Sequence, residues 1–266
     1  VPDLEYKKHP FFGMIKKTTG FSGKSYPVPL QYTNPQGASA TFATAQANKT
    51  AINYEQFIMT RRKDYALHSI DSEAIMASAN DDGSFIRGLK NDIDSLRRTN
   101  IRSLARSLFR GGTGSIGQID STVTGTTLTL SNRRDIVHFE KGMKIQFVAT
   151  DGGTLRDSGE ELTISSINRA AGSMVVSANL NTISGLTAAD YIVRSGDNAA
   201  VFEGLRSWIP STVAATSFYG VDRTADSTRL GGLRLDASAM SIEEGLIQAA
   251  AEVQSEGGAP DMVWLN

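Results

Sequence analysis

The chain has 266 residues, a net charge of −1 and a pI of about 6.4. Such a balance excludes proteins that bind nucleic acid or membranes through a strong overall charge. The absence of cysteine excludes disulfides and thiol chemistry, and no apolar run reaches the ~18 residues that a membrane-spanning helix needs.

Residues 1–23 are predicted to form an N-terminal arm. Aromatic residues at 11, 12 and 21 alternate with pairs of lysines, and glycines at 13, 20 and 23 interrupt any regular period. We expect an extended segment that docks on another surface. The alternative is a terminal segment that folds onto its own domain.

Residues 24–70 are predicted to form an extended loop built as a long β-hairpin. Residues 24–32 and 52–67 alternate in polarity, and Pro27 and Pro29 confine the first strand to an edge. A change of phase near residue 56 suggests a bulge or a twist. The middle, 33–49, has little to bury, and such a hairpin is marginal alone. We expect it to lie on a neighbouring subunit, and the alternative is a floppy loop. The expected contact residues are Tyr32, Phe42, Arg61, Arg62 and Lys63.

A long amphipathic helix is predicted over residues 81–110, after a short helix over 71–79. Apolar residues recur at helical spacing from Ile86 to Leu108, and Gly111 and Gly112 follow as stop signals. At 1.5 Å per residue, about 28 residues span roughly 40 Å. We interpret this helix as a spine along which the rest of the subunit is arranged.

Four arginines follow one another at four-residue steps in the second half of this helix: Arg98, Arg102, Arg106 and Arg110. Guanidinium groups on one helix face suit phosphates or the carboxylates of a neighbouring subunit. We predict them as inner-face or inter-subunit contacts. The alternative is a solvated face favoured by the helix dipole and by pairing of Asp94 with Arg98.

Residues 120–195 differ in character from the helical part. Short apolar runs alternate with turn residues such as Lys141-Gly142 and the triplet at 151–153. This spacing predicts a small antiparallel β-barrel or sandwich, inserted into the remaining fold. The overall class is therefore α+β.

The last part of the chain returns to a mixed pattern. Residues 196–235 are predicted to be mostly irregular and to belong with 71–119. Ser241 is expected to cap a helix from Ile242 to about Gln254, and residues 262–265 to start a buried strand. Because residue 1 is not methionine, we expect residues before Val1 that are either missing from this sequence or removed by processing. Because the chain stops in an apolar strand, we expect further residues after Asn266.

The residue patterns that accompany catalysis and cofactor binding are missing from the sequence. His9, His68 and His138 are isolated, so no metal site is predicted. Residues 112–117 match G-x-G-x-x-G, but they follow a helix, whereas a dinucleotide site needs a preceding strand. We expect no enzymatic activity, no catalytic residues and no cofactor.

Two stretches, residues 204–210 (GLRSWIP) and 218–232 (FYGVDRTADSTRLGG), resemble the major capsid proteins of tailed phages with the Hong Kong 97 fold. Residues 241–247 and 260–266 are similar to the helix and strand that follow in that family. The resemblance implies an arm (1–23), an extended loop (24–70), a peripheral domain with the spine helix (71–119 and 196–235) and the start of an axial domain (236–266). The module at 120–195 is an insertion in that plan.

The resemblance further implies a virion protein that assembles in the host bacterial cytoplasm into an icosahedral shell of pentamers and hexamers. Its partners would be copies of itself, packaged double-stranded DNA held by non-specific contact, and scaffolding, portal or decoration proteins, with no membrane. Some relatives cross-link subunits through a Lys-Asn bond, but no motif here assigns such a pair.

Two other functions remain open from the sequence. An encapsulin-like shell protein of a bacterial nanocompartment would have the same fold and would enclose an enzyme instead of a genome. A β-rich ligand-binding or carbohydrate-binding protein would use residues 120–195 as its working part, although aromatic residues are few there.

Overall fold

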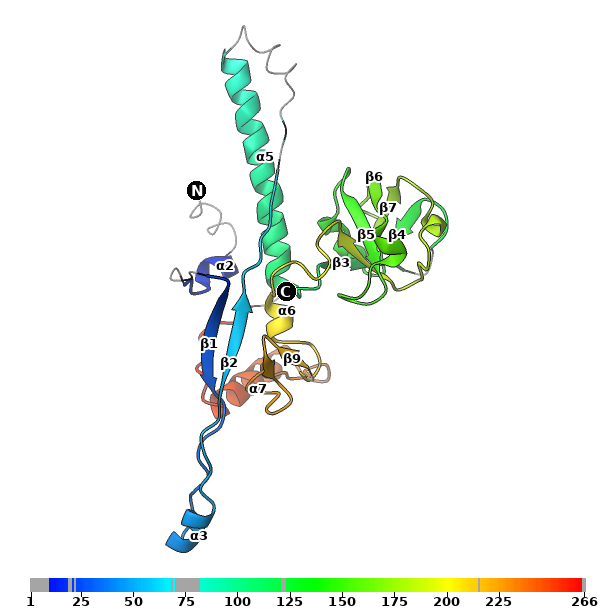
Figure 1. Cartoon of the computed structure of the whole chain (residues 1–266). Helices are drawn as coiled ribbons and strands as arrows, with labels where there is room; N and C mark the ends of the chain where they lie inside the picture. The colour runs from blue at the N-terminus through cyan, green and yellow to red at the C-terminus, as the bar shows by residue number, and fades with distance from the viewer. Residues whose placement is uncertain are drawn as a thin grey trace. The chain divides into compact units, whose positions relative to one another are not determined.

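The structure, a computed structural model, describes residues 10–18, 21, 23–67, 69, 82–120, 123–214 and 216–264. The chain divides into two compact units, the first formed by residues 1–17 and 62–207, the second by 18–61 and 208–266. Helices and antiparallel sheets occupy separate segments of the chain (Figure 1), so the predicted α+β class is confirmed.

The longest element of the first unit is helix α5 (Asp82–Phe109), which has 28 residues and confirms the predicted spine helix. Its C-terminal half is packed: Ser103 and Ser107 are buried. Gly204 explains how the returning chain approaches the helix end, because a Cβ there would lie 2.1 Å from the Ser107 carbonyl oxygen. The predicted short helix at 71–79 lies outside the described residues.

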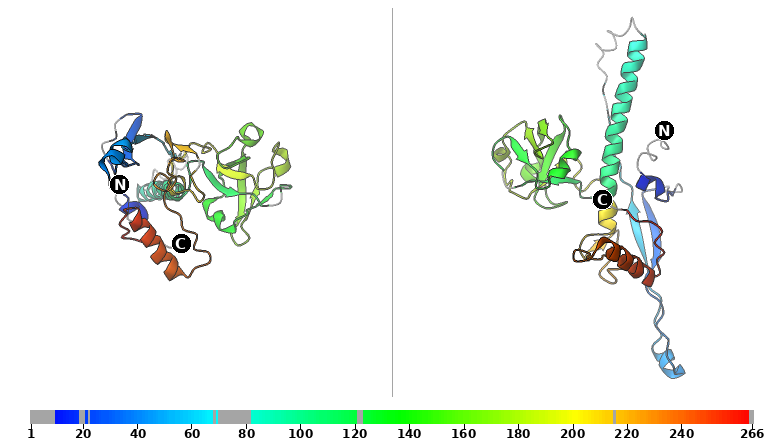
Figure 2. Two further views of the ribbon diagram at one scale, coloured as in Figure 1. Left: turned by 90° about the horizontal axis from the view of Figure 1, so that it is seen from below. Right: turned by 180° about the vertical axis from the view of Figure 1, so that it is seen from behind.

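The first unit also contains a six-stranded antiparallel sheet in the order β3-β8-β5-β6-β7-β4. The strands are β3 (Ser115–Gln118), β4 (Thr127–Thr129), β5 (Lys144–Val148), β6 (Leu162–Asn168), β7 (Ser173–Val176) and β8 (Tyr191–Arg194). A bridge between Ile119 and Leu130 joins the two edge strands, so the sheet closes into a small barrel. Figure 2 shows this barrel from two further directions.

The barrel interior accounts for the apolar runs in the sequence. Phe139, Phe147, Leu128, Ile145 and Leu180 are fully buried and belong to one continuous core. Three short 3-10 helices connect the strands: η1 (Arg133–His138), η2 (Arg156–Gly159) and η3 (Leu180–Thr182). The barrel starts at β3, before the predicted start at residue 120, because β3 pairs with β8.

The second unit is built on a hairpin of β1 (Ser25–Gln31) and β2 (Tyr54–Thr60). The pairing runs without a register shift from Ser25 opposite Thr60 to Gln31 opposite Tyr54, so the predicted bulge is wrong. Residues 54–56 are all exposed, so their polarity does not show which side chains face which side of the hairpin. Strand β1 has one neighbour, as its two prolines require.

Beyond the strands, the two legs of the hairpin continue side by side to a short helix, α3 (Phe42–Ala47), at the tip (Figure 1). Two threonine hydroxyls link the legs where the backbone pairing has ended. The Thr33 hydroxyl accepts from the Asn53 backbone amide (2.9 Å), and the Thr50 hydroxyl accepts from the Gln36 backbone amide (3.0 Å). The helix at the tip was not predicted, and no residue of it is buried.

An aromatic cluster anchors the base of the hairpin within the second unit. Phe57 of β2 meets Trp208 (ring centroids 5.4 Å apart), and Trp208 meets Phe218 (4.9 Å). Trp208 ends helix α6 (Leu205–Trp208), while Phe218 lies in the small hairpin of β9 (Ser217–Phe218) and β10 (Val221–Asp222). The stretch that carries the family resemblance therefore packs against the extended loop.

The C-terminal helix α7 (Ile242–Ser255) has the predicted cap, since the Ser241 hydroxyl accepts from the Glu244 amide (3.2 Å). Gly245 is buried in this helix, Ile242 and Leu246 are exposed, and Ala249, Ala250 and Val253 are half-buried. The predicted buried strand is wrong for residues 262–264, which are exposed and irregular. An apolar run alone does not specify a strand, because a strand also depends on ladder hydrogen bonds with another extended segment.

The arm differs from the prediction as well. Residues 10–14 form a short helix, α2 (Pro10–Met14), where an extended chain was expected. Phe11 stacks on Phe109 at the end of α5, with ring centroids 5.2 Å apart, and this contact holds the helical turn in the first unit. This part of the arm follows the alternative of a terminal segment that folds onto its own domain.

Candidate functional site

The arginine ladder of α5 is directed in large part at the β-barrel of the same chain. Arg102 pairs with Glu140 (2.6 Å), Arg106 with Asp197 (3.4 Å) and Arg110 with Asp135 (2.7 Å). Arg110 also donates to the Ser115 carbonyl oxygen at 3.0 Å. Three of the four predicted contact residues thus fasten the spine helix to the barrel, and Arg98 remains exposed.

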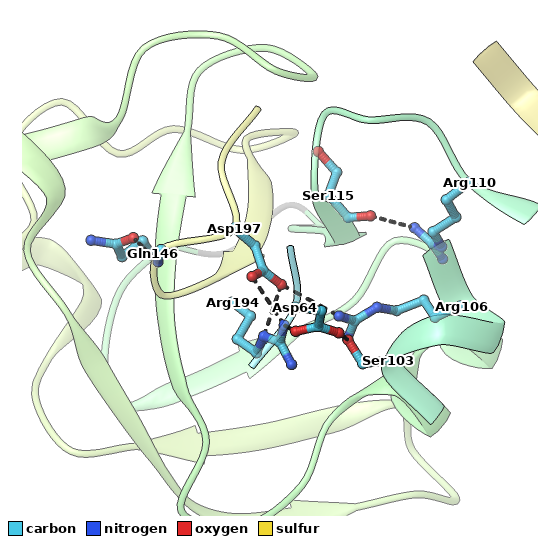
Figure 3. A network of polar contacts seen from close by, with 9 residues as sticks. Asp64, Ser103, Arg106, Arg110, Ser115, Gln146, Arg194 and Asp197 are labelled. Atoms are coloured by element: carbon cyan, nitrogen blue, oxygen red, sulfur yellow. Dashed lines mark hydrogen bonds and ion pairs between the residues drawn. The ribbon is translucent and has the colours of Figure 1, made fainter. Parts of the chain in front are cut away.

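The centre of this interface is a network of two carboxylates, two guanidinium groups and a hydroxyl (Figure 3). Arg194 binds Asp197 through Nε (2.8 Å) and Asp64 through Nη2 (3.1 Å). Asp64 in turn accepts a hydrogen bond of 2.6 Å from the Ser103 hydroxyl of α5. The network therefore joins the segment that leaves the hairpin, the spine helix and the end of β8.

Local backbone chemistry places Asp197 where Arg106 and Arg194 both reach it. Asp197 follows the β8 turn, in which Gly196 has a φ of 81° and donates its amide to the Gln146 side chain at 3.2 Å. Gly114, just after α5, has a φ of 83°, and a Cβ there would lie 2.2 Å from the Asp197 carbonyl oxygen. Only glycine permits this close approach of the two segments.

Burial governs the electrostatics of the interface. The Arg106 side chain is 8% exposed, and burial, together with the charge of Arg194, lowers the pKa of Arg106 to about 10. It stays protonated at neutral pH, so its ion pair with Asp197 persists. Burial and the nearby Arg110 and Arg106 lower the pKa of His138 to about 4, which keeps this imidazole neutral at neutral pH.

The predicted hairpin contacts occupy the base and the distal half of the hairpin. Arg61, Arg62 and Lys63 follow β2 and are exposed, and the Arg61 guanidinium lies 5.1 Å from the Phe21 ring centroid. Tyr32 follows β1, and its carbonyl oxygen accepts a hydrogen bond from Arg229 at 3.3 Å. Phe42 begins helix α3 at the tip. The five residues therefore do not form one site.

Phe42 is the most informative residue of the hairpin. It is 82% exposed, at the start of a helix that has no buried residue. A large aromatic side chain held in water forgoes roughly 1.5–3 kcal/mol of burial. Isolated apolar side chains on a surface are ordinary, but here the exposed ring lies at the tip of an extended hairpin, a geometry suited to insertion into another surface.

A groove of about 740 Å³ runs between α5 and the barrel, within the first unit. Arg102, Arg169, Phe109 and Val137 are among the residues that line it. Within the described ranges, His, Cys, Asp and Glu side chains form no group of three or more that would hold a metal ion. Residues 112–114 lie between α5 and β3, and residues 115–117 belong to β3, so the G-x-G-x-x-G match follows a helix as expected.

Sequence reasoning missed the acidic partners of the ladder. Asp135, Glu140 and Asp197 lie 25, 38 and 91 residues along the chain from Arg110, Arg102 and Arg106. Asp64 lies 39 residues from Ser103, from which it accepts a hydrogen bond. Their alignment depends on how the barrel is placed against the helix. The regular spacing of the arginines was the available signal in the sequence. It identified the helix face that makes contacts, but not the carboxylates that it contacts.

Comparisons with known proteins leave the chain without a relative to argue from. A scan against protein-family models, a search of curated proteins and a search of solved structures each found no match. Among the described residues, every helix is too short or too polar to cross a bilayer.

Proposed function

We propose that the chain is the major capsid protein of a tailed double-stranded DNA bacteriophage, with the Hong Kong 97 fold and an inserted β-barrel. Copies of it would assemble as pentamers and hexamers into an icosahedral shell. The extended hairpin, the long helix and the C-terminal helix occur in the order that the resemblance implies. This order supports the proposal beyond the two short stretches that suggested it.

The observation that carries the proposal is the distal half of the hairpin. Residues 32–53 are largely exposed, α3 has no buried residue, and Phe42 is directed into solvent. Two-stranded hairpins are marginally stable in water and gain stability by packing on another surface. A subunit of a shell offers that surface, because each copy adjoins others of the same sequence.

The ion-pair network supports a structural role in another way. Arg106 and Arg194 both pair with Asp197, Arg194 also pairs with Asp64, and these contacts join the helix to the barrel. Ion pairs arranged in this way hold a geometry. We therefore propose a structural protein without enzymatic activity, with genome DNA contacted by exposed residues such as Arg98.

The contents of purified particles test this function against the nanocompartment alternative. Particles made in the natural host should contain nuclease-protected double-stranded DNA of uniform length, together with portal or scaffolding proteins. The measurement is nuclease digestion followed by electrophoresis and mass spectrometry. Particles that hold one packaged enzyme and no protected DNA would contradict the phage assignment and support the compartment.

A further inference from the structure

The groove between α5 and the barrel has an apolar floor and a basic rim. Phe109 and Val137 line it and are 52% and 62% exposed, although neighbouring parts of both elements are packed. At the rim, Arg102 and Arg169 share a single carboxylate, that of Glu140, at 2.6 and 3.2 Å. One carboxylate for two guanidinium groups leaves the rim with a net positive charge.

Two further cations extend this charge. Arg134 in η1 and Lys141, next to Glu140, are exposed on the same segments that form the barrel side of the groove. A ligand that fits this surface combines an apolar side chain with flanking carboxylates. The apolar floor favours such a protein segment over a nucleic-acid backbone, which would use the rim alone.

Helix α7 presents that combination. Ile247 is 72% exposed, and Glu243 and Glu244 precede it by four and three residues, so both carboxylates flank its side chain on the helix surface. The next turn brings Ala250 and Ala251, which are small enough to allow close approach. The helix sequence contains three glutamates and no lysine or arginine.

We propose that α7 of one copy docks in the groove of a second copy, with Ile247 over Phe109 and Val137 and with Glu243 and Glu244 on Arg102 and Arg169. This contact rests on the proposed self-assembly of the chain and names one of its interfaces. The apolar contact would stabilise the pair, and the opposite charges would select the partner and fix its orientation.

The absence of cysteine from the chain allows a clean cross-linking test. Val137→Cys is introduced in one preparation and Ile247→Cys in a second, tagged one; the two are mixed and oxidised, and mixed disulfides are measured by mass. Cysteine is a small apolar replacement for both residues, and both positions are exposed, so the fold should persist in circular dichroism. A disulfide forms only when the two Cβ atoms come within roughly 4 Å.

The matched control replaces Ile247→Cys with Val213→Cys, which is exposed to a similar degree in the same unit. Docking predicts about tenfold or more mixed disulfide over the control, because docked thiols have a high effective concentration. Adding Glu243→Arg and Glu244→Arg should abolish the excess, and Arg102→Glu with Arg169→Glu in the partner should restore it.

Two results would overturn the inference. One is a yield equal to that of the Val213→Cys control. The other is a disulfide within a single chain when both cysteines are placed in one copy at high dilution. Electron micrographs of the unmodified protein separate the two proposals: shells without the mixed disulfide would remove this interface alone, and the disulfide without shells would remove the capsid function alone.

Discussion

At the scale of single residues, the four arginines of the ladder have the same spacing but differ in burial. Arg106 is 8% exposed and bonded to Asp197, whereas the Arg102 side chain is 70% exposed and pairs with a half-exposed Glu140. Exposed pairs contribute little because water and salt screen them. Breaking a buried pair leaves a desolvated carboxylate with fewer partners.

Arg106→Gln should therefore lower the free energy of unfolding by about 2–3 kcal/mol, while Arg102→Gln and Arg98→Gln should change it by less than about 1 kcal/mol. Chemical denaturation of the three variants checks this order. Equal effects of Arg106→Gln and Arg98→Gln would mean that the network with Asp197 and Arg194 contributes nothing to stability.

The titration of His138 makes the stability of the folded chain depend on pH, and the direction of its pKa shift sets the sign. Its pKa is about 4 in the folded chain and about 6.5 when unfolded. Between these values the unfolded state binds more protons, so stability falls as the pH is lowered from about 6.5 towards 4.

His138→Gln removes this titration and should flatten the stability curve in that window while leaving neutral-pH stability nearly unchanged. Denaturation midpoints at pH 7, 6, 5 and 4.5 provide the measurement. Parallel curves for the variant and the unmodified chain would show that burial does not hold the His138 imidazole neutral.

At the scale of elements, the sequence predicted the helices and strands whose formation depends on local residue patterns. The 28 residues of α5, the cap of α7 and the barrel strands follow from apolar spacing, from Ser241 and from turn residues between short runs. The failures share a cause. The helix at 10–14 depends on Phe11 meeting Phe109, and strand formation at 262–264 depends on long-range pairing. Neither can be read from the local sequence.

The hairpin is the element on which assembly should depend. Deleting residues 33–49 leaves Tyr32 and residues 50–53 to close β1 and β2, whose pairing begins at Gln31 and Tyr54. The deletion removes Phe42 and α3 without touching α5 or the barrel core. It should abolish assembly and preserve the far-ultraviolet helix signal.

Phe42→Ser is the milder counterpart of this deletion. Because Phe42 is exposed, the substitution should leave the stability of the isolated chain within about 0.5 kcal/mol and still reduce assembly. Sedimentation velocity measures assembly, and thermal denaturation measures stability. Intact shells from the deletion would show that the hairpin tip is dispensable.

At the scale of the whole molecule, the candidate site is made of surfaces rather than of a pocket. The barrel interior is filled by a continuous core of its own side chains, from Phe139 to Ile192. The sequence indicated the arginine surface through its spacing, but the carboxylates that it contacts lie far away along the chain.

The exposed hairpin, the spine helix and the barrel are proposed to belong to a self-assembling shell subunit. Electron micrographs of the purified full-length protein at high concentration are the sharpest test of this self-assembly. Closed particles of uniform diameter are expected. A strictly monomeric protein in every field, with sedimentation confirming one small species, would contradict it.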